Sequence, residues 1–136
     1  LQSGLAYLKE TQAAGLMIGR GAIRHPWVFA KLRASFLGEK IPSVTGRMIL
    51  DYIAMLYDET AREHSDFIEH KHVQKMKRYL VYIVQGHVPE FEFAIRRVKT
   101  REEFFAICRE FLENDDPAPE LPPENSKLFC GFSQFL

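Results

Sequence analysis

The sequence predicts a mostly α-helical fold in two parts, a helix–strand–helix stretch followed by a small helical bundle. Three observations support this prediction. The apolar run 16–18, bounded by glycines, is typical of a short strand buried on both faces. The segment 37–46 contains two glycines and a proline and is expected to be a linker. Beyond it, apolar residues keep helical spacing as far as residue 113.

The N-terminal part follows the order helix, strand, glycine loop, helix. Residues 3–14 are expected to form a helix with Ser3 as its N-cap. The strand 16–18 leads directly into the glycine loop. A second helix is expected from Pro26 to about residue 36, because proline fits the first helical position. This order is that of the last third of an α/β unit, and we assign it residues 1–36.

The second part, residues 47–113, is expected to hold four helices. Periodicity places a helix at 46–63, and a short helix is expected at 89–97. Thr100 and Glu103 form a capping box that opens a last helix through residue 112. The remaining helix ends near Gly86 and carries an apolar stripe formed by Val73, Met76, Leu80, Ile83 and Val84.

Composition bounds the class of protein. The chain has 136 residues, 46% of them hydrophobic and 26% charged, which is typical of a globular protein. It is too short for a whole (β/α)8 barrel, which needs ~250 residues. The N-terminus lacks an initiator Met and starts within an element, so we expect a fragment of a longer protein. No apolar run suits a membrane span, and no signal peptide is evident.

The cysteines and the distribution of charge indicate the location and the partners to expect. Cys108 and Cys130 lack the spacing of a zinc site, so no metal is expected and the reducing cytosol is the default location. Residues 70–101 carry 8 basic and 2 acidic side chains, whereas residues 102–136 carry 2 basic and 8 acidic ones. This asymmetry favours a polyanionic partner, although the two blocks could also pair within the fold or simply be solvated. The acidic, proline-rich tail 114–136 is expected to be extended at first, and its apolar end is expected to dock on the body.

The loop Gly19-Arg20-Gly21 is the candidate binding site for an anion. Glycines let a backbone approach a ligand, and successive loop N–H groups next to a helix N-terminus can surround a phosphate. Arg20 could add a charged contact. A simple tight turn is the alternative interpretation of so short a motif.

A longer string around this loop carries a family resemblance. Residues 15–29, Gly-Leu-Met-Ile-Gly-Arg-Gly-Ala-Ile-Arg-His-Pro-Trp-Val-Phe, closely resemble the last barrel strand of the tRNA-dihydrouridine synthases. Residues 76–79 and 95–97 resemble stretches of that family's helical domain, over a diffuse match from 46 to 113. The resemblance implies the end of an FMN-binding (β/α)8 barrel (TIM barrel), followed by a helical domain that grips tRNA.

The same resemblance implies the chemistry. In the family, NAD(P)H reduces FMN, and the flavin gives hydride to a uracil of tRNA while a cysteine on an earlier barrel loop acts as the acid. Gly19, Arg20 and Gly21 would hold the FMN phosphate. His25 stands where the family usually has Asn. The cysteine loop does not occur in this chain, and Cys108 lies on an apolar helix stripe, so we expect no catalytic residue here and no activity from the chain alone.

One helix face is the candidate RNA contact. Lys71, Lys75 and Arg78 cluster with Tyr82 opposite the apolar stripe, and such a face suits a phosphate backbone. Arg96 and Arg97 are expected to be neighbours of this face. Lys77 lies nearer the apolar edge and is expected to snorkel. His64, His70 and His72 could suggest a metal, but residues two apart point to different sides of a helix.

Two alternatives to the synthase stay open. The first is another FMN-dependent barrel oxidoreductase, against which the basic helical domain argues. The second is a helical RNA-binding module without enzymatic activity. In each case we expect a cytoplasmic monomer without a membrane or metal partner.

Overall fold

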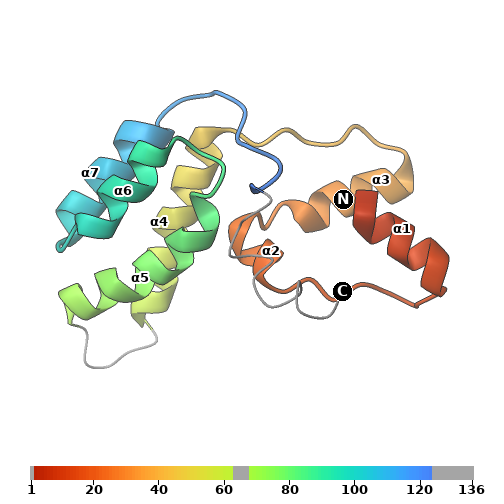
Figure 1. The fold of residues 1–136 in the computed structure, drawn as a ribbon, viewed down its shortest axis with the longest axis horizontal. Coiled ribbons are helices and arrows are strands. Elements are labelled where there is room, and N and C mark those ends of the chain that lie inside the picture. The colour runs from red at the N-terminus through yellow and green to blue at the C-terminus, as the bar shows by residue number, and fades with distance from the viewer. Residues whose placement is uncertain (1, 63–67, 124–136) are drawn as a thin grey trace. The chain divides into compact units, whose positions relative to one another are not determined.

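The computed structural model describes residues 2–62 and 68–123, and these residues form seven helices (Figure 1). The predicted mostly α-helical composition is confirmed. The chain divides between Pro42 and Ser43 into two compact units, the N-terminal and the C-terminal unit. Within the described residues the nearest approach to a sheet is an isolated bridge between Thr45 and Pro117.

The N-terminal unit contains α1 (Gln2–Thr11), α2 (Arg20–Arg24) and α3 (Val28–Leu37). The helix α3 ends at Gly38, whose left-handed conformation (φ 67°) is one that glycine adopts without strain. Helices α2 and α3 pack against each other.

The strand predicted at 16–18 is absent from the described structure. The run has no strand geometry, and the side chain of Met17 is 92% exposed. A parallel strand needs neighbouring strands to satisfy its N–H and C=O groups. The described residues offer this run no such neighbour, so the apolar pattern alone does not produce a strand here.

Two helix starts differ from the prediction. Ser3 lies inside α1, which begins at Gln2, so Ser3 is not the N-cap. Pro26 lies in the turn before α3 instead of at its first position. The preceding residue, His25, is extended (φ −149°, ψ 77°), as expected for a residue before proline, and the unpredicted helix α2 therefore ends at Arg24.

The C-terminal unit contains the four predicted helices, α4 (Gly46–Arg62), α5 (Glu69–Ile83), α6 (Pro89–Arg97) and α7 (Arg101–Leu112). Helix α7 packs against each of the other three, and α5 also packs against α6. The predicted apolar stripe of α5 is buried in this core. The capping box is confirmed, because Oγ1 of Thr100 accepts a hydrogen bond from Glu103 N and the Glu103 carboxylate accepts one from Thr100 N.

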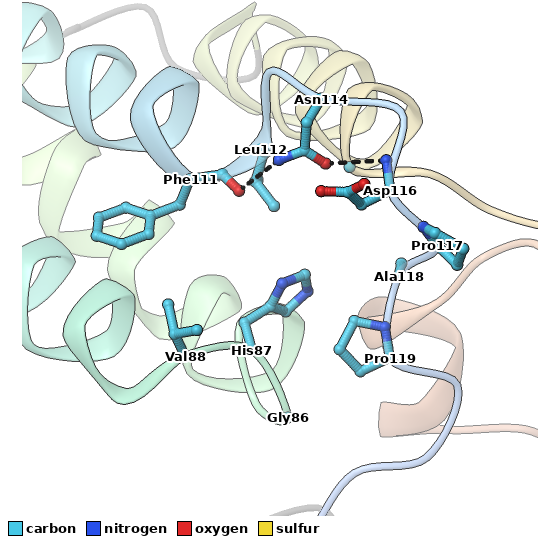
Figure 2. Close-up of a pocket in the computed structure, with 11 residues that line it drawn as sticks. Gly86, His87, Val88, Phe111, Leu112, Asn114, Asp116, Pro117, Ala118 and Pro119 are labelled. Carbon is cyan, nitrogen blue, oxygen red and sulfur yellow. Dashed lines mark hydrogen bonds between the residues drawn. The ribbon is translucent and has the colours of Figure 1, made fainter.

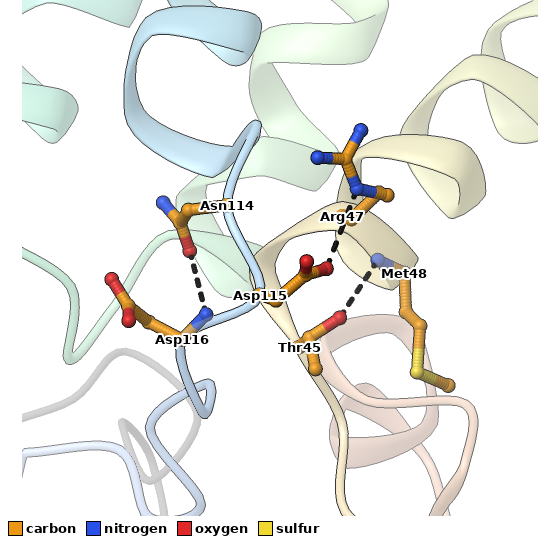
Figure 3. A network of polar contacts seen from close by, with 6 residues as sticks. All are labelled: Thr45, Arg47, Met48, Asn114, Asp115 and Asp116. Atoms are coloured by element: carbon orange, nitrogen blue, oxygen red, sulfur yellow. Dashed lines mark hydrogen bonds and ion pairs between the residues drawn. The ribbon is translucent and has the colours of Figure 1, made fainter.

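The segment after α7 returns along the start of α4 (Figure 3). The N–H groups of Gly46 and Arg47 donate to the carbonyls of Asp116 and Asn114, at 3.1 and 2.9 Å. Arg47 also pairs with Asp115 at 3.4 Å. A Cβ on Gly46 would lie 2.6 Å from Oδ1 of Asn114 and 2.7 Å from the carbonyl oxygen of Leu112. Only glycine therefore allows this close approach.

The beginning of the tail is thus fixed against the C-terminal unit. The end of the tail, including Cys130 and the predicted docking of its apolar residues, lies outside the described residues, as does His64.

Candidate functional site

The glycine loop leads from an exposed stretch into α2. Gly19 is the N-cap of α2, and Ala22 N donates to its carbonyl oxygen at 2.9 Å. Its φ of −88° is open to any residue. A Cβ on Gly19 would meet no other atom within 4 Å, and one on Gly21 would lie 3.6 Å from the side chain of Ile18, an ordinary contact. Neither a left-handed φ nor crowding within the described residues requires glycine at these two positions.

The sequence did not predict the burial of two cations of the N-terminal unit. Arg24 at the end of α2 and Lys31 on α3 are both buried. Burial lowers the pKa of Arg24 from its usual value. The sequence around Arg24 carries no pattern that predicts this burial.

The predicted RNA-binding residues of α5 lie on the side opposite its core stripe. Lys71 and Arg78 are exposed, and Lys75 is half-buried between them. Spacings of four and three residues place the three cations on one helix face. Tyr82 continues this face one turn further and is half-buried. We call Lys71, Lys75 and Arg78 the basic face of α5.

A side-chain hydrogen bond also joins the end of α6 to α5. Nζ of Lys77 donates to the carbonyl oxygen of Arg96 at 2.9 Å. Burial lowers the pKa of Lys77, while Glu103 acts in the opposite direction. Lys77 therefore does more than snorkel, because its ammonium group caps the C-terminal end of α6, where a positive charge is favourable.

The two arginines of α6 differ in their contacts. Arg96 forms an ion pair with Glu92 one turn earlier. The guanidinium of Arg97 lies 3.8 Å from the ring centroid of Phe93. Both arginines are exposed. The pairing of Arg96 stays within the basic block instead of joining it to the acidic end of the chain.

The described histidines of α5 differ in burial, and Cys108 lies in the core. His70 is exposed, whereas His72 is buried with Nε2 2.9 Å from the carbonyl oxygen of Tyr57. No cluster of His, Cys, Asp or Glu that could hold a metal occurs in the described part of the chain. Cys108 is fully buried, as predicted for a core thiol, and burial raises its pKa to about 12. It is a poor candidate for acid catalysis.

One cavity of about 250 Å³ lies between the turn after α5 and the returning segment (Figure 2). His87 and Asp116 are the ionisable side chains that line it. The ring of His87 packs edge-on against Phe91, 6.0 Å away. Backbone and small apolar groups form most of the wall, so the cavity has few side chains that could bind a polar ligand or catalyse a reaction.

The described residues contain no helix that is long and apolar enough to cross a membrane.

Comparison with known proteins gives one consistent result. The family profile described as dihydrouridine synthase (Dus) matches residues 1–115. A probable tRNA-dihydrouridine synthase of Mycobacterium leprae (strain TN) is 27% identical over 118 residues, which are 85% of this chain and 30% of the relative. A protein of the same name from Mycobacterium tuberculosis (strain ATCC 25618 / H37Rv) is 26% identical over the same shares. The chain thus spans about 30% of the length of these curated relatives.

Proposed function

This chain belongs to the dihydrouridine synthase family, and we propose that it is the C-terminal portion of a flavin-dependent tRNA-dihydrouridine synthase. The intact protein would reduce uridine to 5,6-dihydrouridine in tRNA, in the cytoplasm and as a monomer. The observation that carries this proposal is the family match, which extends across both structural units. The names of the mycobacterial relatives support the same reaction.

The N-terminal unit is proposed to be the last part of a (β/α)8 barrel. Large apolar side chains that a complete domain would bury are exposed on it, namely those of Tyr7, Met17, Phe29, Phe36 and Leu37. Such surface is typical of an element that packs against further chain. The missing partners of the 16–18 run fit the same explanation, because a barrel would supply strands on both sides.

The glycine loop fits a phosphate of FMN. The space where a Cβ of Gly19 would stand is open, and a ligand can approach the backbone there. We assign the backbone N–H groups of Gly19, Arg20 and Gly21 to the FMN phosphate, with the Arg20 side chain as a charged neighbour. When bound and reduced by NAD(P)H, FMN supplies hydride to the pyrimidine ring.

The remaining role of this chain is to bind RNA. The basic face of α5 has the register of a phosphate-binding surface, and the hydrogen bond from Lys77 to the carbonyl oxygen of Arg96 joins α5 to the end of α6, which carries Arg96 and Arg97. Phosphate contacts of this kind hold an RNA in place without reading its sequence. The C-terminal unit would therefore position tRNA, while the acid that protonates the uracil comes from the part of the protein that precedes this chain.

The test is binding of tRNA by the intact protein at several salt concentrations. The double substitution Lys75→Ala and Arg78→Ala removes two cations of the basic face. Each lost phosphate contact should lower the slope of log affinity against log salt by about one. The matched control is Arg62→Ala with Arg109→Ala, which removes the same charge from exposed positions outside the basic block.

The expected result is weaker binding and a shallower slope for the first pair and little change for the control. Equal effects of the two pairs would show that only total charge matters and would remove α5 from the interface. A parallel assay follows dihydrouridine formation by the intact protein with NAD(P)H. Absence of the product from all tRNA substrates would refute the proposed reaction.

A further inference from the structure

An exposed aromatic ring stands within the basic region of the C-terminal unit. Phe93 lies on the outer side of α6 and is 58% exposed. Among the described residues of this unit, the other exposed large apolar side chains are aliphatic, namely those of Met55, Ile68, Val88 and Leu121. A single exposed apolar side chain is common on protein surfaces, so what distinguishes Phe93 is its surroundings.

The contact between Phe93 and Arg97 differs from the other arginine–aromatic contacts in this unit. Arg101 lies over the rings of Tyr57 and Phe105, at 5.5 and 5.0 Å, and both rings are buried. That cation covers the edge of the core. Arg97 instead lies 3.8 Å from the centroid of an exposed ring, on an exposed side chain. The contact therefore places a guanidinium group over an exposed ring, and both groups face solvent.

A groove of about 580 Å³ adjoins this ring. Phe93 of α6 and Ile107 and Phe111 of α7 give it an apolar lining. The two helices run side by side (Figure 1). Glu90 and Glu110 also line the groove. Carboxylates repel a phosphate, whereas Arg96 and Arg97 at the end of α6 attract one. The distribution of charge suits an occupant with a neutral, flat part in the groove and an anionic part at the arginines.

We propose that Phe93 and Arg97 form a stacking platform for an unpaired nucleobase of the bound RNA. Aromatic rings and guanidinium planes are the surfaces on which proteins stack unpaired bases. The base lies against the platform and the groove, and its flanking phosphates lie toward Arg96. The inference rests on the proposed RNA-binding function and adds a contact that duplex RNA cannot make.

Two conservative substitutions separate stacking from charge. Arg97→Lys keeps the charge and removes the plane, and Phe93→Leu keeps an apolar side chain and removes the ring. The probes are an RNA hairpin with an unpaired loop and a blunt RNA duplex of equal charge, each titrated with the intact protein. We expect each substitution to weaken hairpin binding roughly tenfold, to change duplex binding less than twofold, and to leave the salt slope of both unchanged.

A spectroscopic readout tests the stack directly. 2-Aminopurine placed in the hairpin loop should be quenched by the wild-type protein and less so by Phe93→Leu. Should the leucine variant fail to fold, Arg97→Lys decides the question alone. Unchanged hairpin affinity, or equal losses on hairpin and duplex, would overturn the platform.

The outcome also separates this inference from the proposed function. If Lys75→Ala with Arg78→Ala leaves both RNAs bound as before while the platform variants lose the hairpin, the phosphate surface is wrong and the platform stands. The reverse pattern removes the platform and keeps the basic face. Failure of the intact protein to bind either RNA would refute both.

Discussion

The junction between α4 and the returning segment offers the sharpest test of the structure. Gly46 is buried at the first position of α4, and its missing side chain is replaced by Asn114 and by the backbone of Leu112. In Gly46→Ala, the new methyl group would lie 2.7 Å from a carbonyl oxygen that cannot move without displacing the end of α7. Overpacking of this kind costs about 1–3 kcal/mol.

Helix propensity opposes this cost in part. Alanine is favoured over glycine within a helix by up to ~1 kcal/mol, and less at a helix end. The net expectation is a loss of about 1–2 kcal/mol. For a domain of this size each kcal/mol lowers the melting temperature by roughly 4–8 °C. Circular dichroism melts of the intact chain measure the shift.

The matched control is Arg47→Ala, one residue further along the same junction. Arg47 pairs with Asp115, but both side chains are largely exposed, so the pair is expected to contribute under ~1 kcal/mol. A wild-type melting temperature for Gly46→Ala, or an equal loss for both variants, would refute the argument that close packing at Gly46 holds the returning segment.

Two further predictions concern the core of α7 and its cap. Because burial raises the pKa of Cys108 from 9.0 to about 12, the unfolded thiol ionises first as pH rises, and the stability that the neutral thiol confers should be lost between these values. Urea unfolding of the wild type and Cys108→Ala at pH 8 and pH 11 measures this, and parallel losses in the two proteins would contradict it. Thr100→Ala removes the acceptor for Glu103 N and should cost about 1 kcal/mol, whereas Thr100→Ser should keep the cap. Chemical denaturation of both variants decides this, and equal stabilities would show that the hydroxyl does not contribute.

The helices of the C-terminal unit could be predicted because periodicity and burial agree there. The stripe that includes Val73, Met76 and Leu80 is buried along its whole length, so the register read from the sequence is that of the structure. The start of α7 could be predicted because its capping box involves only residues 100–103. Tyr57 was missed, although it is among the largest buried side chains, because a tyrosine on a charged helix also suits a surface position.

The failures in the N-terminal unit arise from information that is not local. The 16–18 run has the pattern of a buried strand, but a strand exists only where other strands pair with it. Helix α2 has five residues, too few for periodicity to reveal it. Residues 44–47 form hydrogen bonds with residues 114–118, about seventy positions later in the chain. No local sequence pattern predicts such a contact.

The candidate site shows the same division. The basic face of α5 follows from helical register, and its role in RNA binding stays a prediction. The link from Lys77 to Arg96 depends on the packing of α6 against α5, which the sequence did not reveal. The contact of Arg97 with Phe93, four residues earlier on α6, needs only the register of that helix.

Two positions of the chain, 46 and 19, differ in whether the fold explains the presence of glycine. The fold accounts for Gly46, because any larger residue would collide with Leu112 and Asn114. It does not account for Gly19, whose φ of −88° is not left-handed and whose surroundings are open. A glycine in such a position has room on one side for a group that approaches the backbone, and a phosphate held by loop N–H groups is a group of that kind. The substitution that disrupts the C-terminal unit at Gly46 should therefore leave stability unchanged at Gly19, where its effect should fall on cofactor retention by the intact protein.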